Sequence, residues 1–347
     1  MVADTMSGVQ LVGHGGPEML VWNDAIPVPE LSAGDVLVEV GAAGVNNTDI
    51  NTRVGWYSKG DGDGDDASWG GAALSFPRIQ GADVTGRIVA VGADIDSNRI
   101  GTRVLVDPCF LVWEGAPVAT AVYMGSECDG GFAQFARVPS VHAHAIETDL
   151  SDVELASFPC SYSTSENMLT RARVGPGDRV LVTGASGGVG SATVQLARAR
   201  GAEVIAVTSP SKAEGLKALG AVETLTRDDI PADVLGANSV DVVVDLVAGP
   251  AFPGLLDVMA PFGRYAVAGA IGGPIVDLDV RTLYLKDLTF FGCTVLEPVV
   301  FPNLVKRIEA GDIKPLVAES YPLADIARAQ ADFGEKAHTG KLVLEVR

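Results

Sequence analysis

The segment from Arg179 to Lys212 reads RVLVTGASGGVGSATVQLARARGAEVIAVTSPSK, and its pattern decides the fold of the second half of the chain. The continuous apolar runs at 179–184 and 203–208 are typical of parallel strands that helices cover on both faces. The stretch 191–201 has the apolar spacing of a helix and ends in glycine. This order of strand, helix and strand predicts a βαβ unit in a doubly wound sheet.

A glycine-rich turn joins the first strand to the helix. It consists of Ala185, Ser186, Gly187, Gly188, Val189 and Gly190. Glycine at 187 and 188 lets the backbone approach a pyrophosphate, and glycine at 190 lets the helix pack close to the strand. The helix N-terminus offers N–H groups and the positive end of its dipole to the phosphates. The turn therefore predicts a dinucleotide site; a purely structural glycine turn is the alternative.

The end of the second strand distinguishes between the two nicotinamide cofactors. An NAD site usually has Asp or Glu there, which binds the ribose hydroxyls. This chain has Thr208, Ser209, Pro210, Ser211 and Lys212 instead. Hydroxyls and an ammonium suit a 2′-phosphate, and Arg227 lies just after the next turn, from which it can reach the same place. These residues predict NADPH, although Lys212 alone is equally well explained as an exposed residue in the first turn of a helix.

Length and composition limit the class of protein. The 347 residues are enough for two domains, and 47% hydrophobic with 20% charged residues is an ordinary globular mixture. The formal net charge of -19 disfavours nucleic acid and anionic membranes as partners. No apolar run has the length of a membrane span, and the N-terminus lacks a signal-peptide pattern. We therefore expect a soluble, cytoplasmic protein.

The chain has two parts with different patterns. Up to about residue 145, short alternating runs broken by Gly and Pro predict an all-β domain with strands at 35–45, 86–92 and 102–108. From about 155 to 300, strands alternate with helices; the predicted strands are 179–184, 203–208, 241–249 and 264–271, and the helices 191–201, 212–220 and 253–261. The fold class is thus α/β, with a β domain at 1–150, completed by 301–347, and a doubly wound domain at 151–300. The closing segment predicts two helices and a strand.

An acidic loop at 59–74 interrupts the first domain. Asp61, Asp63 and Asp65 alternate as in a calcium loop. Asp66, however, stands where the tight-turn glycine belongs, and Ala72 where the bidentate Glu belongs. A flexible acidic loop is the better interpretation.

Six stretches together resemble the medium-chain dehydrogenase/reductase superfamily, in its zinc-free, zeta-crystallin-like quinone oxidoreductase branch. They fall in the family's order and are GHGGPEML (13–20), AAGVNNTDINTRVGWY (42–57), GADVTGRIVAVG (81–92), DGGFAQFARVP (129–139), VGPGDRVLVTGASGGVGSATVQLA (174–197) and HTGKLVLEV (338–346). The resemblance implies a GroES-like β domain closed by the C-terminal segment, a Rossmann domain, and a cofactor in the cleft between them. It also implies a homodimer or homotetramer that pairs through an edge strand within 283–296.

The resemblance raises the question of zinc. Zinc-dependent relatives have Cys at the position of Asn46, a His-Glu pair in the motif that here reads Gly81-Ala82-Asp83, and Cys or His at the position of Cys160. Only Cys160 is present, and one thiolate cannot hold a catalytic zinc, which needs about three protein ligands. We therefore expect no metal.

Without zinc, reduction of a quinone or an α,β-unsaturated carbonyl is easier than oxidation of an alcohol. Hydride addition puts negative charge on the carbonyl oxygen, so the site needs a hydrogen-bond donor and a proton donor. The resemblance puts the amide of Asn46 beside the nicotinamide, and Tyr57 resembles the proton donor of zinc-free enoyl-thioester reductases. A turn-forming Asn46 and an ordinary loop-edge Tyr57 are the alternatives. Asp49 is expected to bond backbone amides at a helix start.

The remaining candidate contacts come from the resemblance alone. It implies that the backbone of Val247, Gly269, Ala270 and Ile271 holds the nicotinamide carboxamide, that Lys341 adds to the phosphate site, and that Cys293 belongs to the cofactor-binding residues. The predicted function is NADPH-dependent, zinc-free reduction of a small quinone or α,β-unsaturated carbonyl. The alternatives are an alcohol dehydrogenase or ketoreductase of the same superfamily, and a crystallin-like NADPH-binding protein without significant turnover.

Overall fold

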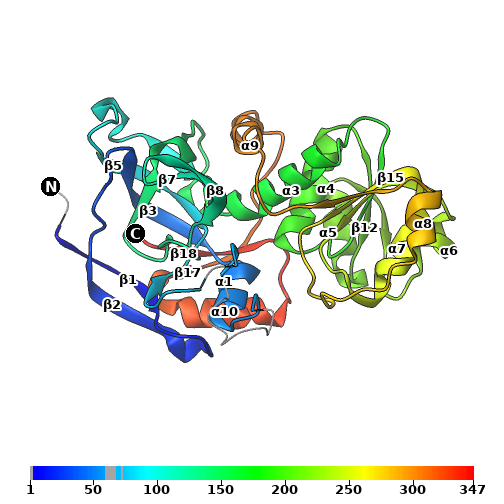
Figure 1. Ribbon diagram of the computed structural model, residues 1–347, viewed down its shortest axis with the longest axis horizontal. Helices are drawn as coiled ribbons and strands as arrows, with labels where there is room; N and C mark the ends of the chain where they lie inside the picture. The colour runs from blue at the N-terminus through cyan, green and yellow to red at the C-terminus, as the bar shows by residue number, and fades with distance from the viewer. Residues whose placement is uncertain (1–2, 59–67, 72) are drawn as a thin grey trace. The chain divides into compact units, whose positions relative to one another are not determined.

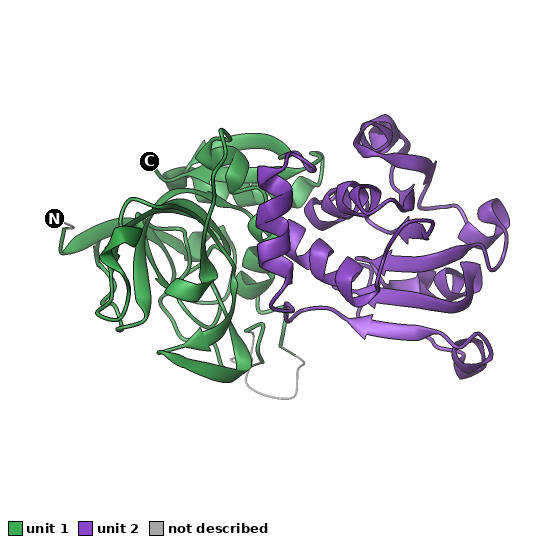
Figure 2. Ribbon diagram, turned by 90° about the horizontal axis from the view of Figure 1, so that it is seen from above, with its two compact units in different colours: residues 1–160, 315–347 green, residues 161–314 purple. Residues whose placement is uncertain are grey.

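The chain forms two compact units, and the predicted α/β class, with a β domain and a doubly wound domain, is confirmed. The computed structural model describes residues 3–58, 68–71 and 73–347, so most of the predicted acidic loop lies outside the described residues. Unit 1 comprises residues 1–160 and 315–347, and unit 2 comprises residues 161–314 (Figure 2). The sequence predicts these divisions at 150 and 300.

Unit 2 is built on one parallel sheet in the strand order β13-β12-β11-β14-β15-β16, with helices along it (Figure 1). The strands are β11 (Arg179–Val182), β12 (Glu203–Val207), β13 (Ala221–Leu225), β14 (Val240–Asp245), β15 (Met259–Val267) and β16 (Thr289–Gly292). The helices are α3 (Pro159–Arg171), which starts at the boundary of the units, α4 (Gly188–Ala199), α5 (Ala213–Leu219), α6 (Pro231–Leu235), α7 (Phe252–Val258), α8 (Val280–Leu285) and α9 (Val300–Glu309).

The central strands of unit 2 are buried on both faces, as their continuous apolar runs predict. Leu181 of β11, Ile205 of β12 and Val243 of β14 are fully buried in one core cluster. Helix α7 is shorter than the predicted helix at 253–261. It ends at Val258, because Met259 already pairs with Val240 and begins β15.

Unit 1 is a mainly antiparallel β domain. One sheet has the order β2-β1-β4, a second has β10-β6-β5-β3-β18-β17 with β9 also paired to β3, and β7 forms a hairpin with β8. The strands are β1 (Thr5–Leu11), β2 (Leu20–Pro27), β3 (Asp35–Gly44), β4 (Arg78–Ile79), β5 (Asp83–Val91), β6 (Arg103–Val106), β7 (Cys109–Trp113), β8 (Ala116–Tyr123), β9 (Phe135–Pro139), β10 (Ala143–Ala145), β17 (Val317–Pro322) and β18 (Lys341–Glu345). The helices are α1 (Asn47–Arg53), α2 (Asp152–Leu155) and α10 (Ile326–Glu335).

The C-terminal segment completes unit 1 by adding β18 to β3. Val343 lies opposite Gly44 in this antiparallel pair, so the continued register brings Lys341 toward Asn46. The prediction of a single strand in this segment is wrong, because β17 also pairs with β18. Strand β17 has no apolar run that would reveal it: within it only Tyr321 is buried. Helix α9, predicted to belong to the first domain, lies in unit 2.

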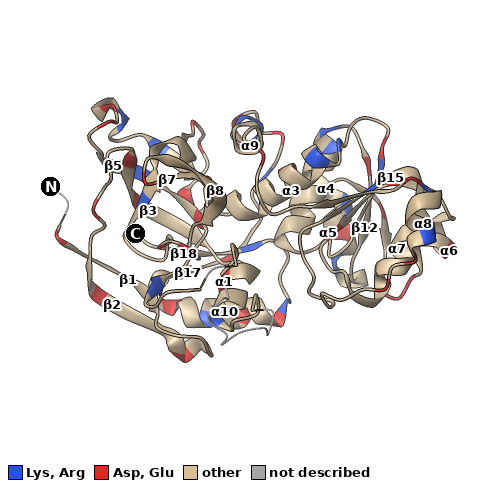
Figure 3. Cartoon of the chain, viewed as in Figure 1, with Lys and Arg blue, Asp and Glu red and all other residues tan. Residues whose placement is uncertain are grey.

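Acidic and basic residues occur throughout both units of the chain. Asp and Glu are interspersed with Lys and Arg along the ribbons of both units (Figure 3). Within the described part of the chain, no helix combines the length and the apolar character that crossing a bilayer requires.

Candidate functional site

The strand order of unit 2 reverses between β11 and β14, and this reversal locates a binding site. In doubly wound sheets, ligands bind outside the carboxyl ends of the two strands at such a switch point. Here those ends lead into two segments, 183–190 after β11 and 246–249 after β14. The predicted glycine-rich turn and the predicted contact Val247 therefore lie at the site that the topology selects.

The turn after β11 has the geometry of a phosphate cradle. Gly187 caps the twelve-residue helix α4 and provides no side-chain acceptor for its first N–H groups. A Cβ atom at Gly187 would meet only the carbonyl oxygen of Gly184, at 3.4 Å, so the space above it is open. At Gly190 a Cβ atom would lie 2.3 Å from that same oxygen, so helix and strand pack as closely as predicted. This open, donor-rich turn fits a pyrophosphate.

The end of β12 gathers hydroxyls and cations. Thr208 is buried, and its Oγ1 has no hydrogen-bond partner within the described residues. The hydroxyls of Ser209 and Ser211 lie 3.2 Å apart. Burial and the nearby positive charge of Arg227 lower the pKa of Lys212, so the two cations lie within electrostatic reach of one another. An anion would relieve their repulsion and give Thr208 a partner.

The remaining predicted contacts in unit 2 lie on neighbouring segments. The amide of Gly272 donates to the carbonyl oxygen of Val247 over 2.7 Å, which joins the segment after β14 to the one that carries Gly269, Ala270 and Ile271. Cys293 follows β16; its amide donates to Val267, and burial raises the pKa of its thiol. A buried, neutral thiol is chemically inert.

In unit 1, three buried side chains form a closed cluster. The ammonium of Lys341 lies 2.6 Å from Oδ2 of Asp83 and donates to Oδ1 of Asn46, also over 2.6 Å. Nδ2 of Asn46 donates to the same Oδ2 of Asp83 over 2.8 Å. Asp83 is 0% exposed and Lys341 3%. The sequence predicts Lys341 at the cofactor phosphates; the structure shows its charge engaged within unit 1, and the phosphate role stays a prediction.

The bonds within this cluster limit which hydrogen bonds Asn46 can make to a substrate. Its amide oxygen accepts from Lys341, and its second N–H faces the carbonyl oxygen of Gly44 at 3.4 Å, a long contact. A substrate oxygen would therefore have to replace that weak bond to receive a hydrogen bond from Asn46. The predicted role of Asn46 as a hydrogen-bond donor to the substrate stays a prediction, and it requires that the substrate displace the carbonyl oxygen of Gly44.

Asp49 lies beside the cluster in the first turn of helix α1 and bonds a backbone amide at the helix start, as predicted. Its Oδ2 accepts the backbone N–H of Asn46 over 2.7 Å. Burial, reinforced by the charge of Asp83, raises the pKa of Asp49 to about 7. The other carboxylate oxygen of Asp83 accepts the amide of Cys160, which places that cysteine at the edge of the cluster.

Tyr57 lies among aromatic rings, half-buried. Its ring centroid is 5.3 Å from that of Trp56 and 6.4 Å from that of Trp69, both in edge contacts. Burial raises the pKa of Tyr57, while a hydrogen bond from Asn51 opposes the rise. The phenol therefore keeps its proton at neutral pH, as a proton donor must.

A directed chain of hydrogen bonds fixes the partner of Tyr57. The ammonium of Lys336, which can only donate, binds Oδ1 of Asn47 over 3.2 Å. Nδ2 of Asn47 then donates to Oδ1 of Asn51 over 3.2 Å, which leaves Nδ2 of Asn51 to donate to the phenol oxygen. Because the phenol oxygen accepts this bond, its own O–H is left to donate elsewhere.

Comparison with known proteins supports a single family. The model of the zinc-binding dehydrogenase family matches residues 188–310, and that of the alcohol dehydrogenase GroES-like domain matches residues 32–148. A crystal structure from Sinorhizobium meliloti 1021, provisionally assigned as an alcohol dehydrogenase, is 48% identical with a TM-score of 0.91, covering 99% of this chain and 97% of its own. The chain belongs to the medium-chain dehydrogenase/reductase superfamily, in its quinone oxidoreductase branch.

Curated relatives of this superfamily carry two kinds of name. The quinone oxidoreductase of Rattus norvegicus is 28% identical over 356 residues, covering 98% of this chain and 97% of its own. The NAD-dependent alcohol dehydrogenase of Sulfurisphaera tokodaii is 27% identical over 359 residues, covering 98% and 99%. The superfamily consists of pyridine-nucleotide dehydrogenases, and the cradle, the orphan hydroxyl of Thr208 and the paired cations fit such a cofactor.

Zinc, which the description of one matching family names, does not fit the residues of this superfamily member. Among the described residues, no three His, Cys, Asp or Glu side chains lie together as metal ligands would. Asp83, the carboxylate in the motif where the resemblance expects zinc ligands, already holds the ammonium of Lys341. A zinc ion there would have to displace the ammonium of Lys341, a cation that belongs to the chain itself.

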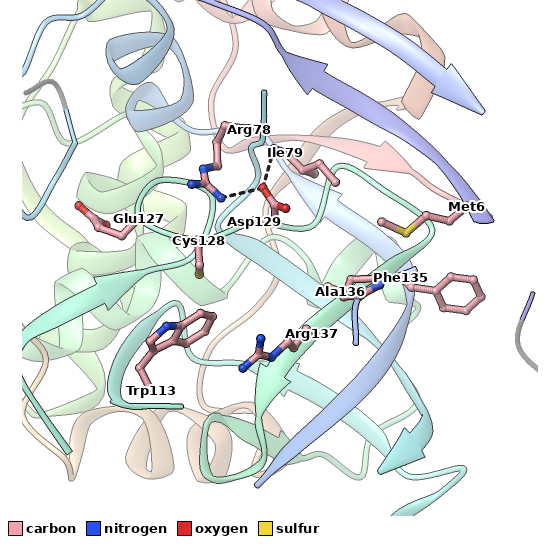
Figure 4. A pocket seen from close by; sticks show the side chains of 12 residues that line it. Met6, Arg78, Ile79, Trp113, Glu127, Cys128, Asp129, Phe135, Ala136 and Arg137 are labelled. Carbon is pink, nitrogen blue, oxygen red and sulfur yellow. Dashed lines mark hydrogen bonds and ion pairs between the residues drawn. The ribbon is translucent and has the colours of Figure 1, made fainter. Parts of the chain in front are cut away.

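A separate cavity of about 230 Å³ lies in unit 1 and contains none of the predicted site residues (Figure 4). Its two arginines are already paired: Arg78 donates to Asp129 over 2.8 Å, and Arg137 binds Asp35 and Glu114. Glu127, which also lines the cavity, accepts the backbone amides of Gly70 and Tyr123. The arginines are therefore already neutralised and do not favour an anionic ligand here.

Sequence reasoning missed two groups that organise these sites. One is the pairing of Asp83 with Lys341, and the other is a buried carboxylate, Asp245, at the end of β14. The signal for Asp245 was present, since a charged residue ends an otherwise apolar strand. The pairing of Asp83 had no signal, because its partner lies near the other end of the chain.

Replacement of Lys341 by Met should destabilise unit 1 by ~3–5 kcal/mol, because it leaves Asp83 buried without a counter-charge. The double variant Asp83→Asn/Lys341→Met should recover much of this loss. Urea denaturation followed by tryptophan fluorescence measures the effect in unit 1, since all four tryptophans lie there. Lys217→Met, which breaks an exposed pair with Glu214, is the control and should change little. A loss below ~1 kcal/mol for Lys341→Met would contradict the buried pairing.

Proposed function

We propose that this protein is an NADPH-dependent, zinc-free reductase of quinones or α,β-unsaturated carbonyl compounds. The observation that carries the proposal is the end of β12: Lys212 and Arg227 lie within electrostatic reach of one another, the buried hydroxyl of Thr208 has no hydrogen-bond partner among the described residues, and residues 208–212 contain no carboxylate. The name of the rat relative supports the quinone part of the proposal.

The choice of cofactor rests on charge. A 2′-phosphate brings about two negative charges, which Lys212 and Arg227 can bind while Thr208 and the neighbouring serines donate hydrogen bonds. NADH presents two neutral hydroxyls at the same place and would leave the two cations repelling one another. The relative from Sulfurisphaera tokodaii uses NAD, so membership of the superfamily alone does not select the cofactor.

Lys212→Ala and Arg227→Ala should each weaken NADPH binding about 10- to 100-fold, because each removes a charge-assisted hydrogen bond of ~1.5–3 kcal/mol. NADH binding should stay within about twofold, since NADH lacks the phosphate that these residues contact. Calorimetric titration of both nucleotides gives the comparison. Lys217→Ala on α5, whose ammonium pairs with Glu214, is the matched control. Tighter binding of NADH than of NADPH by the unaltered protein would overturn this part of the proposal.

The substrate class follows from what the chain offers in place of a metal. The bound nucleotide supplies a hydride, which a conjugated carbonyl accepts at its β-carbon and a quinone at its ring system. The developing negative charge then needs a hydrogen bond and a proton. Tyr57 keeps its proton at neutral pH and has a fixed hydrogen-bond acceptor role toward Asn51, so its O–H is the group of unit 1 best suited to deliver that proton.

The purified protein should oxidise NADPH with a simple quinone or enone as acceptor, and this activity should survive dialysis against a chelator. Tyr57→Phe should lower kcat for an enone about 100-fold, because it removes the proton donor, and should leave NADPH affinity unchanged. Tyr284→Phe, at an exposed tyrosine of α8, is the control. Stoichiometric zinc together with alcohol oxidation would identify an alcohol dehydrogenase instead. Tight NADPH binding without turnover on any acceptor would identify a crystallin-like binding protein.

We also propose that two copies pair through the edge of the unit 2 sheet. Strand β16 ends that sheet, and exposed apolar side chains are frequent in the segment before it: Ile275 is 89% exposed and Leu285 71%. Unpaired strand edges and apolar patches favour association. Sedimentation equilibrium should give at least twice the chain mass of 35.8 kDa, and Leu285→Glu should lower it. A monomer at micromolar concentration would contradict the pairing.

A further inference from the structure

Asp245, the last residue of β14, is a fully buried carboxylate that accepts four hydrogen bonds. Its Oδ1 accepts from the hydroxyl of Thr183 over 2.5 Å and from the amides of Val247 and Ala248 over 2.9 and 3.0 Å. Its Oδ2 accepts from the hydroxyl of Tyr265 over 2.5 Å. A carboxylate has about four acceptor positions, and four donors of unit 2 bind this one, three of them at Oδ1.

These bonds fix the backbone after β14 in a conformation that it would not adopt freely. Ala248 has φ +55° and ψ −141°, a region that costs a non-glycine residue ~1–3 kcal/mol. The hydroxyl of Thr183 also accepts the amide of Leu246 over 2.9 Å. Three consecutive amides, 246 to 248, are therefore held by Thr183 and Asp245 together.

The fixed segment in turn holds its neighbour. Gly272 donates to the carbonyl oxygen of Val247 over 2.7 Å. A Cβ atom at Gly249 would lie 2.3 Å from the carbonyl oxygen of Gly272, and one at Gly269 would lie 2.7 Å from that of Leu246. Segments 246–249 and 268–273 thus pack backbone against backbone, too closely for any side chain between them.

We propose that Asp245 is a positioning residue for the nicotinamide half of the cofactor. It fixes the shape of 246–249 and, through that segment, the placement of 268–273, which together carry the four predicted nicotinamide contacts. The inference rests on the proposed function only in requiring a nicotinamide cofactor. The adenosine half belongs to the other side of the switch point, where the cations after β12 lie, and is expected not to depend on Asp245.

This division gives the test. Calorimetry measures the affinity of each variant for NADPH and for 2′-phospho-ADP-ribose, which lacks the nicotinamide. Asp245→Ala should weaken NADPH binding about tenfold or more, since two backbone amides lose their acceptor, and leave 2′-phospho-ADP-ribose within about twofold. Asp245→Asn, which keeps an acceptor oxygen for the same amides, should restore most of the NADPH affinity. Lys217→Ala, at the exposed pair with Glu214 on α5, is the control and should leave both affinities unchanged.

Three results would overturn the inference: equal weakening of both ligands by Asp245→Ala, no weakening of either, or no rescue by Asn. Should Asp245→Ala fail to fold, Thr183→Val takes its place, because it frees the amide of Leu246 in a nearly isosteric side chain. It should weaken NADPH about threefold and spare 2′-phospho-ADP-ribose; an unchanged NADPH affinity would count against the proposal. If the unaltered protein prefers NADH, the NADPH assignment fails, and the same ratio measured with NADH and ADP-ribose still decides the role of Asp245.

Discussion

A carboxylate removed from water must regain, from the protein, the donors that it loses, because an uncompensated buried charge costs several kcal/mol. Each unit of this chain places such a carboxylate next to its candidate site: Asp83 in unit 1 and Asp245 in unit 2, both fully buried. Donors distant in sequence bind both of them: Lys341 binds Asp83, and Thr183 and Tyr265 bind Asp245. Satisfying the carboxylate therefore fixes several segments at once, which is the rigidity that a binding site needs.

The two carboxylates have different kinds of hydrogen-bond donor, and each kind of donor has a different structural effect. Asp245 has four neutral donors, two of them backbone amides, so its effect is to hold a loop. Asp83 has an ammonium, an amide and a backbone N–H, so its effect is to hold a charge. Asp49, next to it, makes no direct ion pair among the described residues, and its pKa, raised by burial to about 7, leaves it only partly ionised at neutral pH, which lowers the negative charge beside the cluster.

The sequence predicts the features that depend on residues close together in the chain. The glycine-rich turn, the buried strands and the hydroxyl-rich end of β12 each lie within a few residues and carry their own physical signature. The pairing of Lys341 with Asp83 depends instead on β18 joining β3, a contact between the two ends of the chain. Strand β17 escaped prediction for a related reason: it is formed by its pairing with β18 and has little apolar surface of its own.

The hydrogen bonds of Asn46 show that the type of a residue does not reveal which partners its donors have in the fold. An amide at that position has two N–H groups, and the sequence gives no means of knowing that Asp83 and Gly44 face them. In the structure, the Asn46 amide belongs to a buried hydrogen-bond network with Asp83 and Lys341. Catalytic use of Asn46 then depends on the weak 3.4 Å contact with Gly44, whereas no acceptor among the described residues is seen for the phenol proton of Tyr57.

The acidic surface makes the local arrangement of cations more important. With a net charge of -19, the molecule repels an anionic nucleotide, although salt largely screens this repulsion beyond about 8–10 Å at physiological ionic strength. Under the proposed function, binding then comes from contacts made after approach: N–H groups of the glycine-rich turn, hydroxyls after β12, and the neighbouring cations Lys212 and Arg227. Salt weakens the long-range repulsion more than it weakens these close contacts. A site of this design therefore tolerates high ionic strength better than one that relies on a broadly basic surface.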